Sequence, residues 1–87
     1  MSKSIMSLNE VKAGDRVQVV EIDGGRKATN RLMELGIMEG VKIDVVNNGG
    51  GPLILKVGNS KFALGQGIAM KIKVQEIGKK YQNVSVN

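Results

Sequence analysis

Apolar and polar residues alternate in several short segments separated by glycines, a pattern typical of short β-strands. After a short turn at residues 7–14, the alternation predicts five strands. They span residues 16–22, 41–46, 53–57, 61–64 and 70–77. Short strands joined by glycine bends predict a mostly β protein that folds as a small, partly open barrel.

The first predicted strand does not alternate regularly. Val17 and Val19 would share one face, whereas Val20 and Ile22 would share the other. A β-bulge explains such a slip, and so does a strand whose centre is buried on both faces. Bends of this kind help small barrels to close.

One short helix is predicted at residues 26–35, directly after the first strand, with Leu32 and Leu35 on one face. Gly36 follows at the point where a helix often ends in a left-handed residue, because glycine has no Cβ atom to clash there. Gly40 then permits a second bend into the next strand. These two glycines predict a helix end followed by a tight turn.

The chain has 87 residues, which corresponds to one small domain. It contains one Phe, one Tyr and no Trp, so the core must consist mainly of aliphatic side chains. We expect a disordered N-terminus at residues 1–6, a domain at residues 7–78 and a flexible tail at residues 79–87. No apolar run reaches membrane-spanning or signal-peptide length, so we expect a soluble, cytoplasmic protein without direct membrane insertion.

The sequence contains neither His nor Cys, the usual ligands of zinc, copper and haem and the usual partners in nucleophilic catalysis. Only oxygen ligands remain. Glu34 with Glu39, or Glu21 with Asp23, could hold a hard cation weakly, although solvated surface charge is the better interpretation of each. The sequence therefore predicts no enzyme, no cofactor and no metal site.

The formal charge is +5, which favours an acidic partner, a nucleic acid or an anionic membrane surface. The charges are scattered, so a basic protein without any polyanionic ligand fits equally well. A nucleic-acid-binding barrel would use Arg16, Arg26, Lys27 and Arg31, and residues 14–20 resemble the opening of a ribosomal KOW-type element. The scarcity of aromatic residues makes this alternative the less favoured one.

Residues 32–40 resemble the most characteristic motif of the FeoA family, a leucine and a glycine followed by isoleucine and a second glycine. Pro52 to Val57, and Ala63-Leu64 leading to Ile72 to Val74, fall in the order and spacing of the family's later elements. The residue before the second glycine is often proline in the family and is Glu39 here.

The resemblance implies an SH3-like barrel with a partner rather than a reaction. FeoA proteins are small cytoplasmic accessory proteins of bacterial ferrous iron uptake, and they are thought to act on FeoB, a membrane transporter with a cytoplasmic GTP-binding domain. Exposed strand edges in a small barrel also allow a weak homo-oligomer.

We expect the partner to bind at the helix end and the turn that follows it. The candidate contacts are four apolar residues and three bases that could steer an acidic partner. They are Met33, Leu35, Ile37, Met38, Arg26, Lys27 and Arg31. Leu35 and Ile37 fit a core role better than a surface role, so Met33 and Met38 are the stronger candidates.

Overall fold

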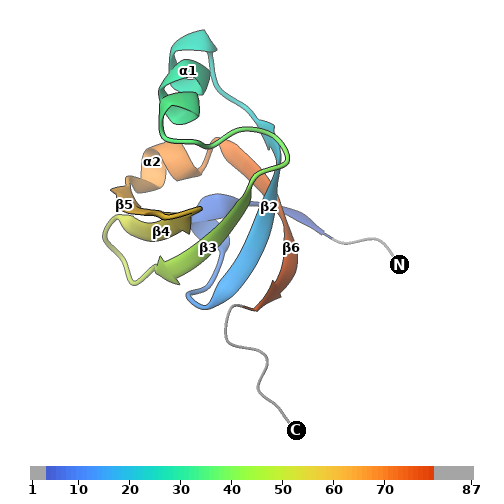
Figure 1. The fold of residues 1–87 in the computed structure, drawn as a ribbon, viewed down its shortest axis with the longest axis vertical. Coiled ribbons are helices and arrows are strands. Elements are labelled where there is room, and N and C mark those ends of the chain that lie inside the picture. The colour runs from blue at the N-terminus through green and yellow to red at the C-terminus, as the bar shows by residue number, and fades with distance from the viewer. Residues whose placement is uncertain (1–3, 80–87) are drawn as a thin grey trace, which may run out of the picture.

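The structure, a computed structural model, describes residues 4–79 of the chain and contains six strands, one 3₁₀ turn and two helices (Figure 1). In chain order these are β1 (Ile5–Ser7), η1 (Leu8–Glu10), β2 (Asp15–Ile22), α1 (Arg26–Glu34), β3 (Lys42–Asn47), β4 (Leu53–Val57), β5 (Ser60–Leu64), α2 (Gln66–Ala69) and β6 (Ile72–Lys79). Every predicted strand and the predicted helix are present, with bounds that differ by at most two residues.

All six strands belong to one antiparallel sheet with the order β1-β6-β2-β3-β4-β5. The sheet curves around a core and stays open, because β1 and β5 are its two edges (Figure 1). The mostly β, partly open SH3-like barrel expected from the sequence is therefore confirmed, with one strand more than expected.

The additional strand is β1, which contains Ile5 and Met6 from the segment expected to be disordered. Ile5 pairs with Gln75, Met6 with Val74 and Ser7 with Lys73. A three-residue strand is too short to show periodicity, and its partner lies at the other end of the sequence, so no local signal predicts it. The expectations for residues 1–3 and 80–87 lie outside the described residues.

The predicted irregularity in the first strand is a bulge at Val20. Val19 pairs with Val74, and Glu21 pairs with the adjacent Lys73, so Val20 has no partner in the register. Val19 is consequently buried while Val20 is exposed. The bulge bends β2 just before the chain leaves the sheet for α1.

The core consists of aliphatic side chains from every element except β1. The buried hydrophobic residues are Leu8, Val11, Val17, Val19, Leu32, Ile37, Ile43, Val45, Leu53, Leu55, Leu64, Ala69, Ile72 and Val74. Leu8 and Val11 belong to the short turn after β1 and contribute to this core. Phe62 is half-buried and packs against this core.

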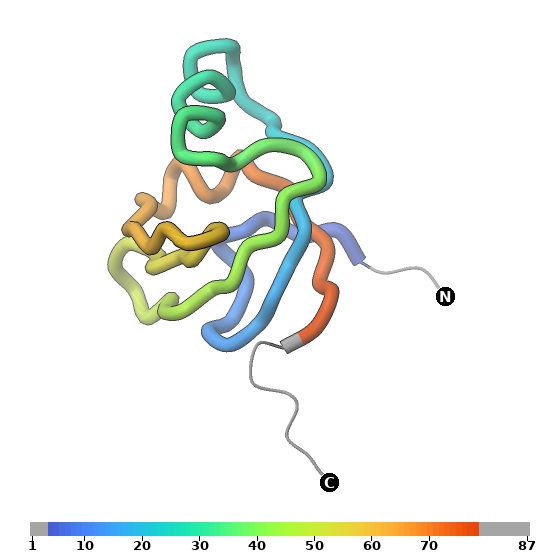
Figure 2. Tube along the Cα trace, viewed as in Figure 1, coloured from blue at the N-terminus to red at the C-terminus, as the bar shows by residue number. Residues whose placement is uncertain are grey.

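The longer helix, α1, stands at one end of the barrel, beyond the ends of the strands (Figures 1 and 2). The trace in Figure 2 leaves β2, forms α1 and returns across the barrel end into β3. The shorter helix, α2, lies between α1 and the strands. The two helices and the segment after α1 therefore form one end of the molecule, where the predicted site residues are found.

Candidate partner-binding site

The end of α1 is a Schellman motif centred on Gly36, whose φ is +86°. The Ile37 nitrogen donates to the Leu32 carbonyl at 2.9 Å, and the Gly36 nitrogen donates to the Met33 carbonyl at 2.9 Å. The side chains of Leu32 and Ile37 are both buried, which supplies the apolar contact typical of this motif. The helix end predicted from Gly36 is confirmed.

The following turn is attached to β2 through its backbone. The Val41 nitrogen donates to the Met38 carbonyl at 3.1 Å, and Gly40 has a φ of +89°. A positive φ at this position is typical of a type II turn, in which proline is common one residue earlier, at the position of Glu39. The Gly40 nitrogen donates to the Val19 carbonyl at 2.8 Å. The turn is therefore held against the sheet.

The predicted apolar contacts are divided between core and surface. Ile37 is fully buried, so its side chain stabilises the fold and cannot meet a partner directly. Met33, Leu35 and Met38 are 48%, 39% and 41% exposed, respectively. Leu35, for which a core role is the better fit from sequence, thus lies at the surface, at the C-cap position where α1 ends.

A small apolar pocket lies between α1 and α2, with a volume of about 70 Å³. Three α1 residues and the C-cap residue Leu35, at helical spacing, line one wall, and residues from the end of β5 and from α2 line the other. The lining residues are Ala28, Arg31, Leu32, Leu35, Leu64 and Ile68. Leu35 and Ile68 are exposed at its surface, and Arg31 is the charged member of the lining.

Two polar side chains connect α2 to the rest of the barrel. The Gln66 side chain donates to Asn48 Oδ1 at 3.0 Å and to the Gly51 carbonyl at 2.8 Å. Asn48 in turn donates to the carbonyls of Asn9 and Val11, at 2.9 and 2.8 Å. This network fixes the start of α2 and thereby the wall of the pocket that carries Ile68.

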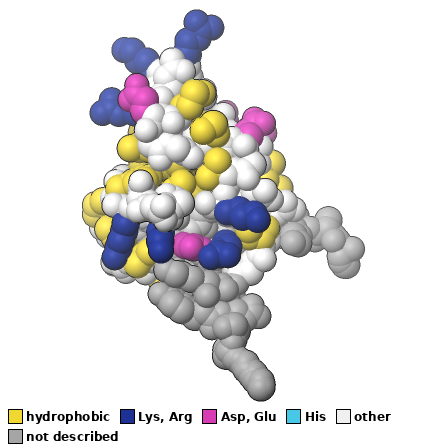
Figure 3. All heavy atoms as spheres, viewed as in Figure 1, with side chains coloured by type: hydrophobic (Ala, Val, Ile, Leu, Met, Phe, Trp, Pro, Cys, Tyr) yellow, Lys and Arg dark blue, Asp and Glu magenta, His cyan; other side chains and the backbone are white. Residues whose placement is uncertain are grey.

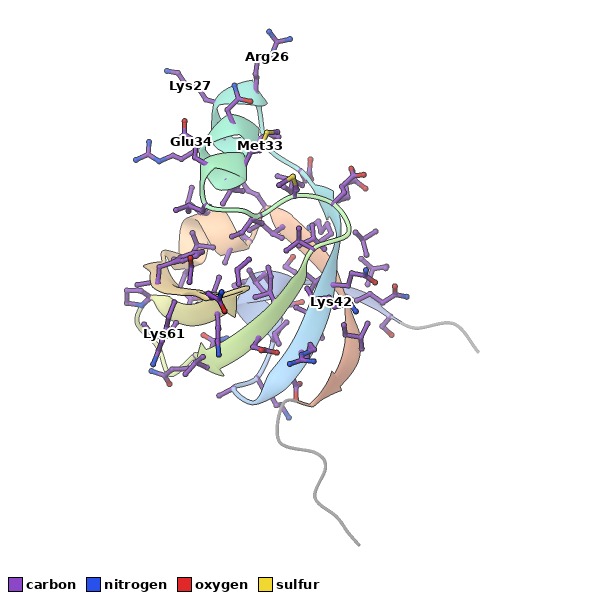
Figure 4. The ribbon with its side chains drawn as sticks, viewed as in Figure 1. Arg26, Lys27, Met33, Glu34, Lys42 and Lys61 are labelled. Carbon is purple, nitrogen blue, oxygen red and sulfur yellow. The ribbon has the colours of Figure 1, made fainter. Side chains whose placement is uncertain are left out.

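The predicted basic residues separate into two groups. Figure 4 shows Arg26 and Lys27 at the outer end of α1, while Met33 and Glu34 project from opposite sides of the helix. Arg31 also belongs to α1, but Arg16 lies on β2, near the end of the strand that is farther from α1. Six residues of strand separate Arg16 from the end of β2, roughly 20 Å. The four bases of the nucleic-acid alternative therefore do not form one surface.

Arg16 is paired with Asp44 on the neighbouring strand. Its Nε donates to Asp44 Oδ1 at 2.6 Å, and its Nη2 donates to Oδ2 at 3.3 Å. The hydrogen bond, and secondarily the negative charge of Asp44, raise the pKa of the Arg16 guanidinium above its ordinary value. Arg16 is thus charged at every pH at which the protein would be studied.

Residues 4–79 contain neither a carboxylate cluster suited to a metal ion nor a membrane-spanning helix. No group of three or more Asp and Glu side chains there is arranged to hold a metal ion. No helix in this range is long and apolar enough to cross a membrane. The apolar pocket between α1 and α2 and the exposed Met33 and Met38 are the candidate contacts at this end of the molecule.

The fold is that of a small SH3-like domain with an apolar pocket at one end, and known proteins share this architecture. Residues 6–76 match the FeoA domain family. A protein of Methanocaldococcus jannaschii named "Putative Fe(2+) transport protein A" is 43% identical over 65 residues, which cover 75% of this chain and 79% of that protein. The chain belongs to the FeoA family.

Solved structures agree with this assignment. The crystal structure of an iron uptake regulatory protein, FeoA, has a TM-score of 0.80 and 35% identity, covering 85% of this chain and 99% of that one. A zinc complex of Stenotrophomonas maltophilia FeoA has a TM-score of 0.71 and 29% identity, covering 79% and 88% of the two chains. That protein is described as an SH3 domain protein and a candidate activating factor of ferrous iron transport.

Proposed function

We propose that this protein is a non-enzymatic, cytoplasmic accessory of ferrous iron uptake that binds the cytoplasmic part of a FeoB-type membrane transporter, including its GTP-binding domain. Membership of the FeoA family supports the role in iron transport. The observation that carries the mode of action is the apolar pocket between α1 and α2. Its lining includes no group that would perform a reaction, so it is suited to binding.

The size of the pocket favours a protein partner over a small molecule. Its volume of about 70 Å³ is far below the several hundred Å³ that small-molecule sites typically enclose. A pocket of this size accepts the tip of an aliphatic side chain from a partner segment. Burying one such side chain against Leu35 and Ile68 would remove apolar surface of both proteins from water, which favours binding.

The charge around the pocket favours an acidic flanking sequence on the partner. Arg31 lines the pocket, and Lys27 and Arg26 lie further along the same helix. Exposed bases of this kind accelerate the encounter with an acidic partner more than they add to the final affinity. We therefore expect the bound segment to combine an aliphatic residue with nearby Asp or Glu.

An NMR titration of the isotope-labelled protein with the isolated GTP-binding domain of the transporter tests this proposal. We expect shifts to concentrate on α1, α2 and the end of β5. If this domain causes no shifts, the same titration with the transporter in detergent covers contacts to its other cytoplasmic parts. Absence of shifts in both titrations would refute the proposed partner.

Paired variants at the C-terminal end of α1 and its C-cap then locate the contact. Leu35→Ser removes the exposed apolar side chain at the pocket, whereas Met33→Ser removes one of similar exposure outside the pocket lining. We expect Leu35→Ser to weaken binding at least about tenfold, the fold equivalent of roughly 1.4 kcal/mol, and Met33→Ser to change it little. The reverse result, or a loss of binding in Met38→Asp alone, would assign the contact to the methionines instead of the pocket.

A further inference from the structure

A row of outward-facing charged side chains crosses four strands of the sheet. The register aligns Arg16 on β2 with Asp44 on β3, Asp44 with Lys56 on β4, and Lys56 with Lys61 on β5. Residues directly opposite one another on adjacent strands point to the same face. Lys42 is two residues before Asp44 on β3 and therefore faces the same way.

We call these five residues the basic sheet face. Its four bases are exposed, and its one acid, Asp44, is half-buried. Figure 3 shows dark blue side chains over the sheet on both sides of an acidic group, on the part of the molecule below α1. Figure 4 labels Lys42 and Lys61, which lie toward opposite sides of this surface.

The charges of this face are not balanced within the fold. The Asp44 carboxylate is occupied by the Arg16 guanidinium through two hydrogen bonds. The ammonium groups of Lys42, Lys56 and Lys61 have no ion pair within the described residues. Lys56 and Lys61 are direct cross-strand partners, an arrangement of like charges that destabilises a sheet. A ligand carrying many negative charges would offset this repulsion.

We propose that the basic sheet face binds anionic lipid headgroups, so that the protein lies on the membrane surface without inserting into it. The choice of a membrane rests on the proposed function, which brings the protein to a membrane transporter. Three mobile ammonium groups spread over a sheet suit a diffuse negative surface, where each nearby Lys or Arg adds to the attraction.

Nucleic acid fits this face less well. Arg is the base that recognises phosphates and base edges through two hydrogen bonds, and the one Arg here already uses this geometry on Asp44. The only aromatic side chain in the described range, Phe62, pairs with the buried Leu55 on the inner face of the sheet. It is therefore not available as a platform on which bases could stack.

The basic sheet face and the pocket share no residue. The pocket lies between α1 and α2 at the end of the barrel, whereas the basic sheet face covers the strands below it (Figures 1 and 3). A protein resting on the membrane through its sheet would therefore keep the pocket open to a second partner. Membrane contact and partner binding can be tested separately.

Co-sedimentation of the full chain with vesicles tests the proposal. The probes are vesicles of phosphatidylcholine alone and vesicles that also contain phosphatidylglycerol, at low salt and at about 0.15 M salt. We expect binding only to the anionic vesicles, weakened by salt. Binding to neither composition, or equally to both, would overturn the proposal without bearing on the pocket, because no transporter is present.

Two double variants with the same change in net charge locate the contact. Lys56→Gln/Lys61→Gln alters the basic sheet face, and Arg26→Gln/Lys27→Gln alters the tip of α1. Each base near an anionic membrane raises the vesicle–water partition coefficient about fivefold. We therefore expect the sheet variant to lower this coefficient about 25-fold and the α1 variant to lower it less than about twofold. Equal losses would show attraction by net charge alone and would overturn the assignment.

A parallel gel-shift assay tests whether the protein binds DNA or RNA, the other polyanions that could contact this face. We expect no complex at about 0.15 M salt. A complex that the sheet variant abolishes, together with absence of vesicle binding, would reassign this face to nucleic acid.

Discussion

Gln66 donates a hydrogen bond to the side-chain oxygen of Asn48 at 3.0 Å, and Asn48 uses its amide hydrogens on the carbonyls of Asn9 and Val11. One asparagine therefore joins the loop after β3, the turn after β1 and the start of α2. These segments are distant in the sequence, and the network fixes the start of α2, the helix whose Ile68 lines the pocket. The pocket depends on this arrangement.

Replacing Asn48 with Ala should therefore lower both stability and the order of α2. The variant removes the hydrogen bonds to the Asn9 and Val11 carbonyls and one of the two that the Gln66 amide donates, at a cost of about 2 kcal/mol in the free energy of unfolding. Urea denaturation measures the loss. The control is Asn59→Ala in the exposed turn after β4, for which we expect about 0.5 kcal/mol or less. Equal stability of the two variants would contradict the structural role of Asn48.

Replacing Gly36 with Ala tests the helix end. A Cβ atom at this position meets only Val57 Cγ1, at 3.8 Å, so no clash is expected. The cost comes from the φ of +86°, which should lower the free energy of unfolding by about 1–2 kcal/mol.

The matched control for that variant is Gly67→Ala in α2. Gly67 has no positive φ, and a Cβ atom there would meet open space. We expect this change to be neutral or to stabilise the protein by about 0.4–1 kcal/mol, because alanine restricts the unfolded chain. A Gly36 variant as stable as the Gly67 variant would show that the left-handed residue does not limit the helix end.

Replacing Ile37 or Leu35 with Ala tests which of the two side chains stabilises the core. Ile37 is fully buried, so the variant should lose about 2–5 kcal/mol of unfolding free energy. Leu35→Ala, at a position 39% exposed, should lose less than about 1.5 kcal/mol and should retain the native melting cooperativity. Thermal denaturation followed by circular dichroism compares the two. Similar losses would mean that Leu35 is part of the core and poorly suited to a partner.

The parts of the fold that the sequence predicts are those with local causes. Gly36 and Gly40 indicate the helix end and the turn because both have positive φ, which glycine adopts without the steric cost of a Cβ atom. The bulge at Val20 is visible as a slip in alternation because each strand residue changes face. These signals need no knowledge of distant contacts.

The parts that sequence reasoning missed depend on pairing and packing between distant segments. β1 exists because β6 offers it an edge, and a three-residue strand carries no pattern of its own. Leu64, at the end of β5, and Ile68, on α2, enter the pocket through tertiary packing, and the hydrogen bond between Gln66 and Asn48 fixes the start of α2. The amphipathic pattern of α1 indicates which residues share a face, but it does not show which of them the barrel buries and which it leaves exposed.

Asp44→Asn should strengthen binding to anionic vesicles, a gain that general damage to the protein would not produce. The change removes the one acid of the basic sheet face and frees the Arg16 guanidinium, which Asp44 otherwise holds at 2.6 Å. We expect the partition coefficient to rise about fivefold, the contribution of one additional charge near the surface. The control is Glu34→Gln on α1, which changes the net charge equally but away from the sheet. Vesicle co-sedimentation at about 0.15 M salt compares the two variants. An equal rise in both, or none in Asp44→Asn, would mean that the row of charges across the strands does not face the lipid.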